Sequence, residues 1–253
     1  MTKNTVDTSQ KFDLERRQEP GLFLFESNSL AARDFWRNTL AREVGSSTVT
    51  PDRYKRSASD ARSGLLTLSV TGAIWSKTKS LTQSKLGLVS LVVLASVGLV
   101  IQRLNCIDSV VLGSPARGQT KESNALPLVL EFLEGQTFHE LLVHAKSVAQ
   151  QAYRHQEYPY TFMSRDLGFS EEAGRCPLFD VSVRCDGLHG VMPPTIEDIA
   201  ISVSPNDAAL SLEIKYKPAL FDASTIERLS WRIDEALSAG VLNPEGRLAD
   251  IDL

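Results

Sequence analysis

ALPLVLEFLEGQTFHELLVHAKSVAQQAYRHQEYPY at residues 125–160, followed by GRCPLFD at 174–180, is the stretch that decides the fold. The apolar run at 126–132 predicts a strand. Thr137 and Glu140 have the spacing of a capping box, in which each side chain accepts a hydrogen bond from the other residue's amide, so a helix should begin there. A stripe at helical spacing needs a sheet to pack against; it consists of Phe138, Leu141, Leu142, Ala145, Val148, Ala149 and Ala152.

Composition excludes several classes of protein. With 253 residues and 42% hydrophobic content, the chain can form one large domain or two small ones. A net charge of -4 argues against a nucleic-acid binder, which needs clustered Lys and Arg. Cys106, Cys176 and Cys185 form no CxxC pair, which argues against a disulfide framework or zinc site and favours a reducing cytoplasm. Residues 1–20 are polar and predict a mobile tail before a domain at 21–253, not a secretory signal.

The most apolar segment is LGLVSLVVLASVGLVI at 86–101. Crossing a membrane takes about 20 apolar residues, so this segment is short for a span. Its small residues permit close packing, and we expect it to be the buried part of one long helix over residues 76–103.

The other segments alternate between strand and helix patterns. Strands are expected at 65–70, 107–112, 179–184, 198–203 and 209–216, the last two joined by a hairpin turn. A helix is expected at 30–40, and a final helix should start with Asp222 or Ser224 as its cap and end at Gly240. Residues 21–26 predict an edge strand or a packed lead-in, and 41–64 and 186–194 predict loops. This pattern predicts an α/β sandwich of two or three layers with a mixed sheet.

Two clusters and one glycine-containing segment resemble a known family. HQEYPY at 155–160 resembles the HQDYPF motif of nonribosomal peptide synthetase condensation domains, and GRCPLFDVSV resembles their RDxSRNPLFxxxF motif. GSPARGQ at 113–119 is similar to their VVxGxPxxGR segment. From about residue 31 to 253 the chain thus resembles the C-terminal half of such a domain, which implies a chloramphenicol-acetyltransferase-like fold. The motif positions are Gly113, Pro115, Gly118, Gln119, Asn124, His155, Tyr158, Pro159, Arg175, Pro177 and Phe179.

The chain also departs from the family pattern. Gln119 stands where the family has an arginine thought to pair with an aspartate of the other half-domain. The connection after Gln119 is short, and residues 186–194 are fewer than the family segment that latches the halves together. The resemblance therefore implies weakened contact with a second half. A face left without that half should be polar or covered by a homodimer contact, because a large bare apolar patch is unstable in water.

No catalytic constellation emerges from the residues. The family's HHxxxDG motif is absent from this sequence, and His155, expected to cap its helix, is only a weak catalytic candidate. His139 and His144 are expected to be exposed, and His189 is expected to face solvent. Cys176 should be a buried small residue. Arg175 is expected to bind a helix carbonyl or form a salt bridge; the alternative is that it anchors a carboxylate or a phosphopantetheine phosphate. No metal site is expected.

Three functions remain open. The first is a free-standing half condensation domain that acts in trans as a docking module for a carrier protein or another synthetase domain. The second is an enzyme component that completes a split active site or catalyses another reaction, such as cyclisation, on a carrier-tethered intermediate. The third is a protein that retains the fold for assembly alone. We expect a cytoplasmic protein with no cofactor of its own, any phosphopantetheine being carried by the partner, and with no nucleic-acid or membrane partner.

Overall fold

A six-stranded mixed sheet organises the computed structural model, which describes residues 27–41, 47–53, 62–118, 123–168, 176–193, 195 and 197–253. The strand order is β1-β6-β5-β4-β2-β3, and β4 pairs in parallel with both β2 and β5 while the other pairs are antiparallel. The predicted mixed sheet is therefore confirmed. The strands are β1 (Gly64–Val70), β2 (Ser109–Pro115), β3 (Ala125–Glu131), β4 (Val181–Cys185), β5 (Ile199–Pro205) and β6 (Leu210–Tyr216).

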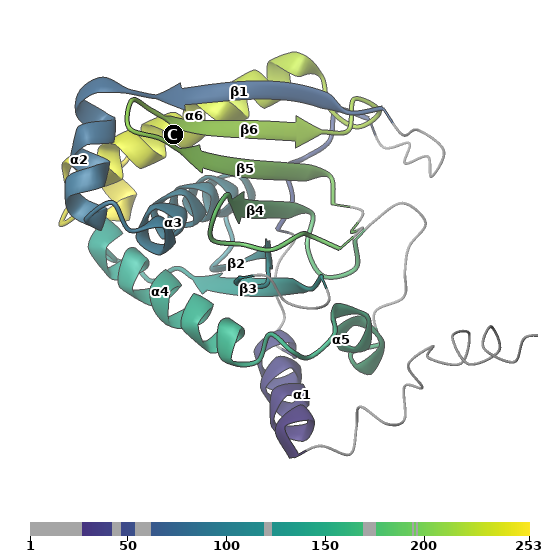
Figure 1. Ribbon diagram of the computed structural model, residues 1–253. Coiled ribbons are helices and arrows are strands. Elements are labelled where there is room, and N and C mark those ends of the chain that lie inside the picture. Colours follow the sequence, from purple (N-terminus) through teal and green to yellow (C-terminus); the bar gives the residue numbers. More distant parts are fainter. Residues whose placement is uncertain are drawn as a thin grey trace, which may run out of the picture.

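Helices form a second layer against this sheet (Figure 1). α6 contacts β1 and β6, α3 contacts β2, β4 and β5, and α4 contacts α3 and β3. α1 and α5 contact each other beside the β3 end of the sheet. The helices are α1 (Ser27–Leu40), α2 (Gly72–Thr82), α3 (Leu86–Asn105), α4 (Phe138–Arg154), α5 (Tyr160–Asp166) and α6 (Ala223–Leu242), with a short 3-10 turn at Leu248–Asp250.

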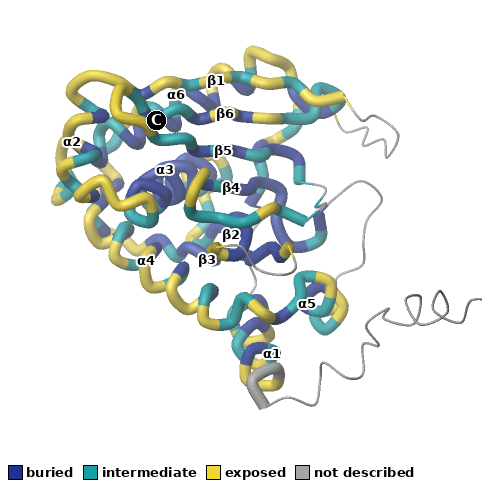
Figure 2. Tube along the Cα trace, in the orientation of Figure 1, coloured by how far each residue is buried: buried dark blue, intermediate teal, exposed yellow. Residues whose placement is uncertain are grey.

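The two faces of the sheet differ in polarity. On β6 the buried Leu210, Leu212 and Ile214 alternate with Glu213 and Lys215, which are exposed. β1 and β5 alternate similarly (Figure 2). The face away from α6 is thus largely polar along β1, β6 and β5, as expected for a surface that meets water.

The apolar helix α3 lies inside the molecule. It is the one helix in the described ranges that is long and apolar enough to cross a membrane, and 67% of its most apolar window is buried. Gly98 contributes to this packing, since a Cβ there would lie 2.7 Å from the Leu130 side chain. The prediction of a buried core segment is confirmed.

The prediction of one long helix over 76–103 is wrong. α2 ends at Thr82 and α3 begins at Leu86, because Gln83 and Ser84 both have left-handed backbone conformations, with φ of 50° and 54°. The Gln83 amide closes α2 by hydrogen bonding to the Lys79 and Ser80 carbonyls. A left-handed helix end is usually marked by a glycine, and neither residue is one. The sequence therefore contains no local signal of this break.

Replacing Gln83 with glycine is expected to raise stability. A left-handed conformation is strained for a residue with a Cβ, and glycine at such a helix end removes that strain, a gain of about 0.5–1 kcal/mol. Thermal unfolding should show a midpoint about 2 °C higher. The matched change Gln150→Gly, at an exposed interior position of α4, should instead lower stability by about 1 kcal/mol. A lower midpoint for Gln83→Gly would contradict this account.

α6 starts after Asp222, as predicted, but its capping bonds and its end differ from the prediction. Asp222 occupies the N-cap position without a side-chain cap bond and pairs instead with Arg53. The carboxylate of Asp52 accepts from the Asp222 amide at 2.8 Å and from the Thr225 hydroxyl at 3.0 Å. Gly240 does not end the helix, which continues to Leu242. Its lack of a side chain serves packing, because a Cβ there would lie 2.5 Å from the Phe138 ring.

Candidate functional site

The side chain of Asn124 joins two of the predicted motif segments. Its Nδ2 donates to the carbonyls of Gln156 at 2.7 Å and Tyr158 at 2.8 Å. Its Oδ1 accepts from the amides of Ala125 at 3.0 Å and Tyr160 at 2.8 Å. Asn124 is buried, and all of its hydrogen-bonding capacity is used. It therefore fastens the 155–160 turn to the start of β3.

His155 is part of the packing between α4 and α1. It occupies the C-cap position of α4, as predicted, and its carbonyl accepts from Trp36 Nε1 at 3.0 Å. Its ring stacks on Phe35 with the ring centroids 4.3 Å apart. Burial lowers the pKa of His155, and the neighbouring Arg154 charge lowers it further. This imidazole packs against an aromatic ring, which favours a structural role.

Tyr158 and Pro159 position α5. The Tyr158 side chain is buried, and its hydroxyl donates to Asp166 Oδ2 at 2.5 Å. That carboxylate also pairs with Arg33 Nε at 3.0 Å. Burial, followed by the Asp166 carboxylate, raises the pKa of Tyr158. Pro159 is the N-cap residue of α5, so this half of the HQEYPY cluster connects α5 to α1.

The second proline-centred cluster packs on β2. A Cβ at Gly113 would lie 2.2 Å from the ring of Phe179, so only a glycine admits that ring. The Tyr160 ring meets Phe179 edge-on with centroids 5.9 Å apart, and its hydroxyl lies 2.8 Å from Cys176 Sγ. Cys176 is buried as predicted, and burial raises the pKa of its thiol. Pro177, beside it, is half-buried.

The remaining motif positions lie around the end of β2. Pro115 is its last residue and is paired with Ala125 of β3. Gly118 follows with φ of 78°, and its amide donates to the Leu188 carbonyl at 3.0 Å. Gln119 and Arg175 lie outside the described residues, as do the expected tail at 1–20, the apolar run at 21–26 and part of the 41–64 loop. The predictions made for them are not tested.

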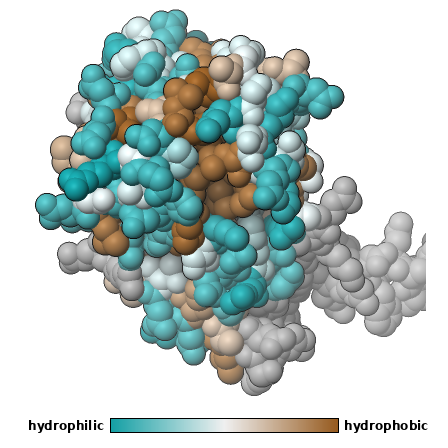
Figure 3. All heavy atoms as spheres, turned by 90° about the vertical axis from the view of Figure 1, so that its left-hand side faces the viewer, coloured by the Kyte–Doolittle hydropathy of each residue, from teal (hydrophilic) through white to brown (hydrophobic). Residues whose placement is uncertain are grey.

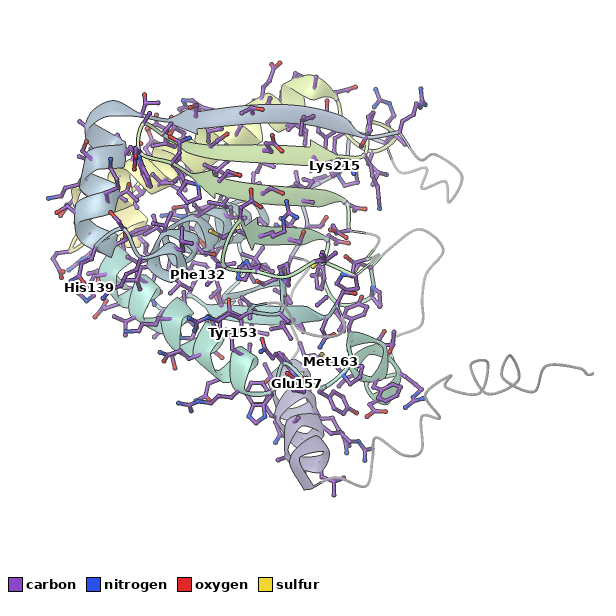
Figure 4. The ribbon with its side chains drawn as sticks, in the orientation of Figure 1. Phe132, His139, Tyr153, Glu157, Met163 and Lys215 are labelled. Atoms are coloured by element: carbon purple, nitrogen blue, oxygen red, sulfur yellow. The ribbon has the colours of Figure 1, made fainter. Side chains whose placement is uncertain are left out.

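The prediction that His189 faces solvent is wrong. Its Nδ1 accepts from the Cys185 amide at 2.9 Å, and its Nε2 lies 2.8 Å from the Tyr153 hydroxyl. Because Nδ1 is an acceptor, the neutral ring carries its proton on Nε2 and donates it to Tyr153. Tyr153 lies on the last turns of α4 (Figure 4). The connector after β4 therefore folds back onto this chain.

Backbone contacts complete that attachment. His189 forms an isolated antiparallel bridge with Arg117, and the Gly190 amide donates to the Ala116 carbonyl at 3.0 Å. The Arg117 amide in turn donates to Gln156 Oε1 at 2.8 Å. The sequence-based prediction did not include this arrangement because glycine-rich composition predicts a mobile loop. The contact between His189 and the distant Tyr153 has no local signal in the sequence.

Stability should fall in acid because of His189. Burial, then the charges of Arg184 and Arg117, lowers its pKa to about 4 from an ordinary 6.5. The unfolded chain therefore binds the proton more readily, and the stabilisation present above pH 6.5 is lost as pH falls toward 4, by about 2 kcal/mol after allowance for partial exposure. Urea unfolding at several pH values should show this loss. His189→Gln should make the profile less steep, and the part that remains should include the contributions of His144 and His155, whose pKa values are also lowered by burial.

His144 is also less exposed than predicted, whereas His139 is exposed as expected and pairs with Glu245 at 3.0 Å. His144 is half-buried, and its Nε2 accepts from the Glu131 amide at 3.0 Å. Burial lowers its pKa. It lines a groove of about 370 Å³ between α1, α4 and β3. With Nε2 occupied, the neutral ring presents only an N–H donor and cannot take a proton there.

Within the described ranges, no three His, Cys, Asp or Glu side chains gather as metal ligands. The motif residues that are described thus form a connected structural cluster. It fixes the connections between β2, β3, α4 and α5. Among the described histidines, His144 and His189 accept backbone N–H bonds, and the His155 ring stacks on Phe35.

Comparison with protein families and curated sequences gives one result. A model described as "Condensation domain" matches residues 23–253. Tyrocidine synthase 2 of Brevibacillus parabrevis is 26% identical over 91% of this chain, and gramicidin S synthase 2 of Aneurinibacillus migulanus is 23% identical over 90%. The chain spans only 7% of the length of the first synthase and 6% of the second.

Solved structures show the same fold. The chain in the complex of the X-domain and OxyB from teicoplanin biosynthesis superposes with a TM-score of 0.77 at 20% identity, covering 96% of this chain and 58% of that one. The starter condensation domain of rhizomide synthetase RzmA gives a TM-score of 0.71 at 18% identity, covering 92% and 56%. This chain therefore corresponds to a little over half of each, which agrees with the expected half-domain.

Proposed function

Because this chain belongs to the condensation-domain family, we propose that it acts in trans in nonribosomal peptide biosynthesis as a docking half-domain. Its partner would be a carrier protein or another enzyme of the assembly line. It would recognise that partner without an active site of its own. Any phosphopantetheine would be carried by the partner.

The state of the imidazoles is the observation that supports this proposal. The sequence lacks HHxxxDG, so a histidine base, the kind that the family motif supplies, would have to be His139, His144, His155 or His189. His155 stacks on Phe35, while His144 and His189 accept backbone N–H bonds. A general base needs a free nitrogen within hydrogen-bond reach of its substrate. These rings are instead used to hold the fold.

The connector after β4 also supports a separate half-domain. It packs on this half-domain through contacts with Tyr153, Ala116 and Arg117. The polar face along β1, β6 and β5 suits a surface that is not permanently covered. The teicoplanin X-domain, similar in fold, was solved in complex with OxyB. That likeness favours a partner enzyme as one class of target.

One observation favours an enzyme component as the second candidate. The groove beside His144 has a volume of about 370 Å³, within the range of small-molecule sites, and is lined by polar as well as apolar groups. Such a groove could hold part of a tethered intermediate if an N-terminal partner supplied the catalytic base. The occupied Nε2 of His144 weighs against chemistry by this chain alone.

The test combines purified chain with carrier proteins loaded with phosphopantetheine-tethered substrates. Binding is measured by calorimetry, and the tethered species by mass spectrometry. Retained binding with an unchanged mass is the expected result. A mass gain from joining two units, or a loss of water on cyclisation, would favour the enzyme and contradict the docking module.

A further inference from the structure

An apolar groove of about 150 Å³ lies where α2, α3 and α4 meet. Figure 3 shows apolar side chains gathered in a hollow on this side of the molecule, with hydrophilic residues around it. The groove is at the opposite end of α4 from the motif cluster, near the labelled His139 in Figure 4. Its lining includes Leu88, Leu91, His139, Leu142, Val143 and Lys146.

The apolar side chains of this groove reach solvent. Val143 is 56% exposed, and Leu88, Leu91 and Leu142 are only half-buried. On the adjoining first turn of α3, Leu86 is 37% exposed. Isolated exposed apolar residues are normal on proteins, but a concave set drawn from several helices is typical of a binding surface.

Charges of both signs lie beside the groove: the lysines Lys85 and Lys146, and the acids Glu140 and Glu245, which are next to lining residues in the sequence. Lys146 lines it and Lys85 immediately precedes α3; both are exposed, and neither forms an ion pair within the part of the chain that the structure describes. Each acid already has a partner on this chain: Glu245 Oε1 lies 3.0 Å from His139 Nδ1, and Glu140 Oε2 accepts from the Thr137 amide at 2.8 Å. The surface therefore offers an apolar hollow beside unpaired ammonium groups.

We propose that this groove binds an amphipathic helix of a partner protein that carries acidic residues beside its apolar stripe. A volume of about 150 Å³ holds roughly one large side chain. A helix repeats its side chains every 5.4 Å or so, so one face can present that anchor together with carboxylates one turn away. Those carboxylates would face Lys146 and Lys85. This inference rests on the proposed docking function and gives the chemistry of its partner.

The same charges disfavour a second copy of this chain as the occupant. A two-fold contact centred on the groove brings identical surfaces together, and would gather Lys85 and Lys146 of both copies in one interface. Like charges across an interface are unfavourable. An acidic partner removes that repulsion.

The test uses two synthetic helical peptides of about 18 residues with one apolar stripe, flanked by glutamates in one and by lysines in the other. Methyl NMR of the full chain should show shifts at Leu88, Leu142 and Val143 with the acidic peptide only. Val143→Glu and Lys146→Glu should each weaken binding about tenfold. Val191→Glu is the matched control, since Val191 is 75% exposed on the connector after β4, and binding should stay within about twofold.

Equal binding of the two peptides, or shifts outside the groove, would overturn the proposal. So would a dimer in light scattering that dissociates on Val143→Glu, because the groove would then belong to a self-contact. Failure of the groove assignment can be distinguished from failure of the proposed docking function. If carrier proteins bind the unchanged chain and the Val143→Glu variant equally, the docking function stands and the groove assignment fails.

Discussion

Replacing Asn124 with alanine is expected to lower the free energy of unfolding by about 4 kcal/mol, because four hydrogen bonds are lost at a buried site, each worth about 1 kcal/mol net. Gln156 and Tyr158 lose the donors to their carbonyls, and Ala125 and Tyr160 lose the acceptor for their amides. For a chain of this size, the melting midpoint should fall by about 10 °C. Thermal and urea unfolding measure both quantities.

Asn124→Asp separates the two sides of this network. A carboxylate retains an acceptor for the amides but places its second oxygen against the Gln156 and Tyr158 carbonyls. It should therefore be no more stable than Asn124→Ala at neutral pH. Asn243→Ala is the matched control: this asparagine is exposed at the end of α6, and the loss should stay below about 0.5 kcal/mol. A loss below 1 kcal/mol or so for Asn124→Ala would show that the turn holds without it.

This expected effect also bears on the meaning of the motif. HQEYPY and the asparagine before β3 are family motif residues, yet in this structure their hydrogen bonds to each other hold the 155–160 turn against β3. A family motif predicts which residues meet, but the chemistry depends on what each atom contacts. Here the atoms of Asn124 and His155 contact their own chain.

The sequence predicted most of the fold because its strands and helices carry strong local signals. The Thr137–Glu140 capping box fixed the start of α4, and both reciprocal bonds are present. Alternation located β5 and β6 and the hairpin between them. Local pattern could not show the break at Gln83 and Ser84, since left-handed conformation at those residues depends on how α2 and α3 pack.

The candidate site was harder to predict than the fold. Gly240 carries the local signal of a helix end, but its function is to admit the Phe138 ring. His189 lies in a turn-rich segment, but tertiary contacts with Tyr153 and Cys185 hold it. Both errors have one cause: a contact between distant segments outweighed the local preference of the residue. The groove between α2, α3 and α4 has no sequence signature for the same reason.

Gly113→Ala is expected to lower stability by about 3 kcal/mol, since overpacking a rigid core site forces side chains and backbone to shift. The added methyl group would lie 2.2 Å from the Phe179 ring, which is itself buried between β2 and Tyr160. A ring in this setting cannot move away as the end of a flexible side chain could. Urea unfolding should detect the loss directly.

Two further variants test whether contact with Phe179 causes the loss of stability in Gly113→Ala. Gly87→Ala, at a half-buried position on the first turn of α3 where a Cβ meets nothing within 4 Å, should raise stability by about 0.5–1 kcal/mol. Gly113→Ala combined with Phe179→Leu should lose less than the sum of the single losses, with a coupling of about 1–2 kcal/mol. Strict additivity would mean that Phe179 is not the obstacle. The motif glycine would then be required for its backbone, and the pairing of β2 with β4 would be the contact to examine.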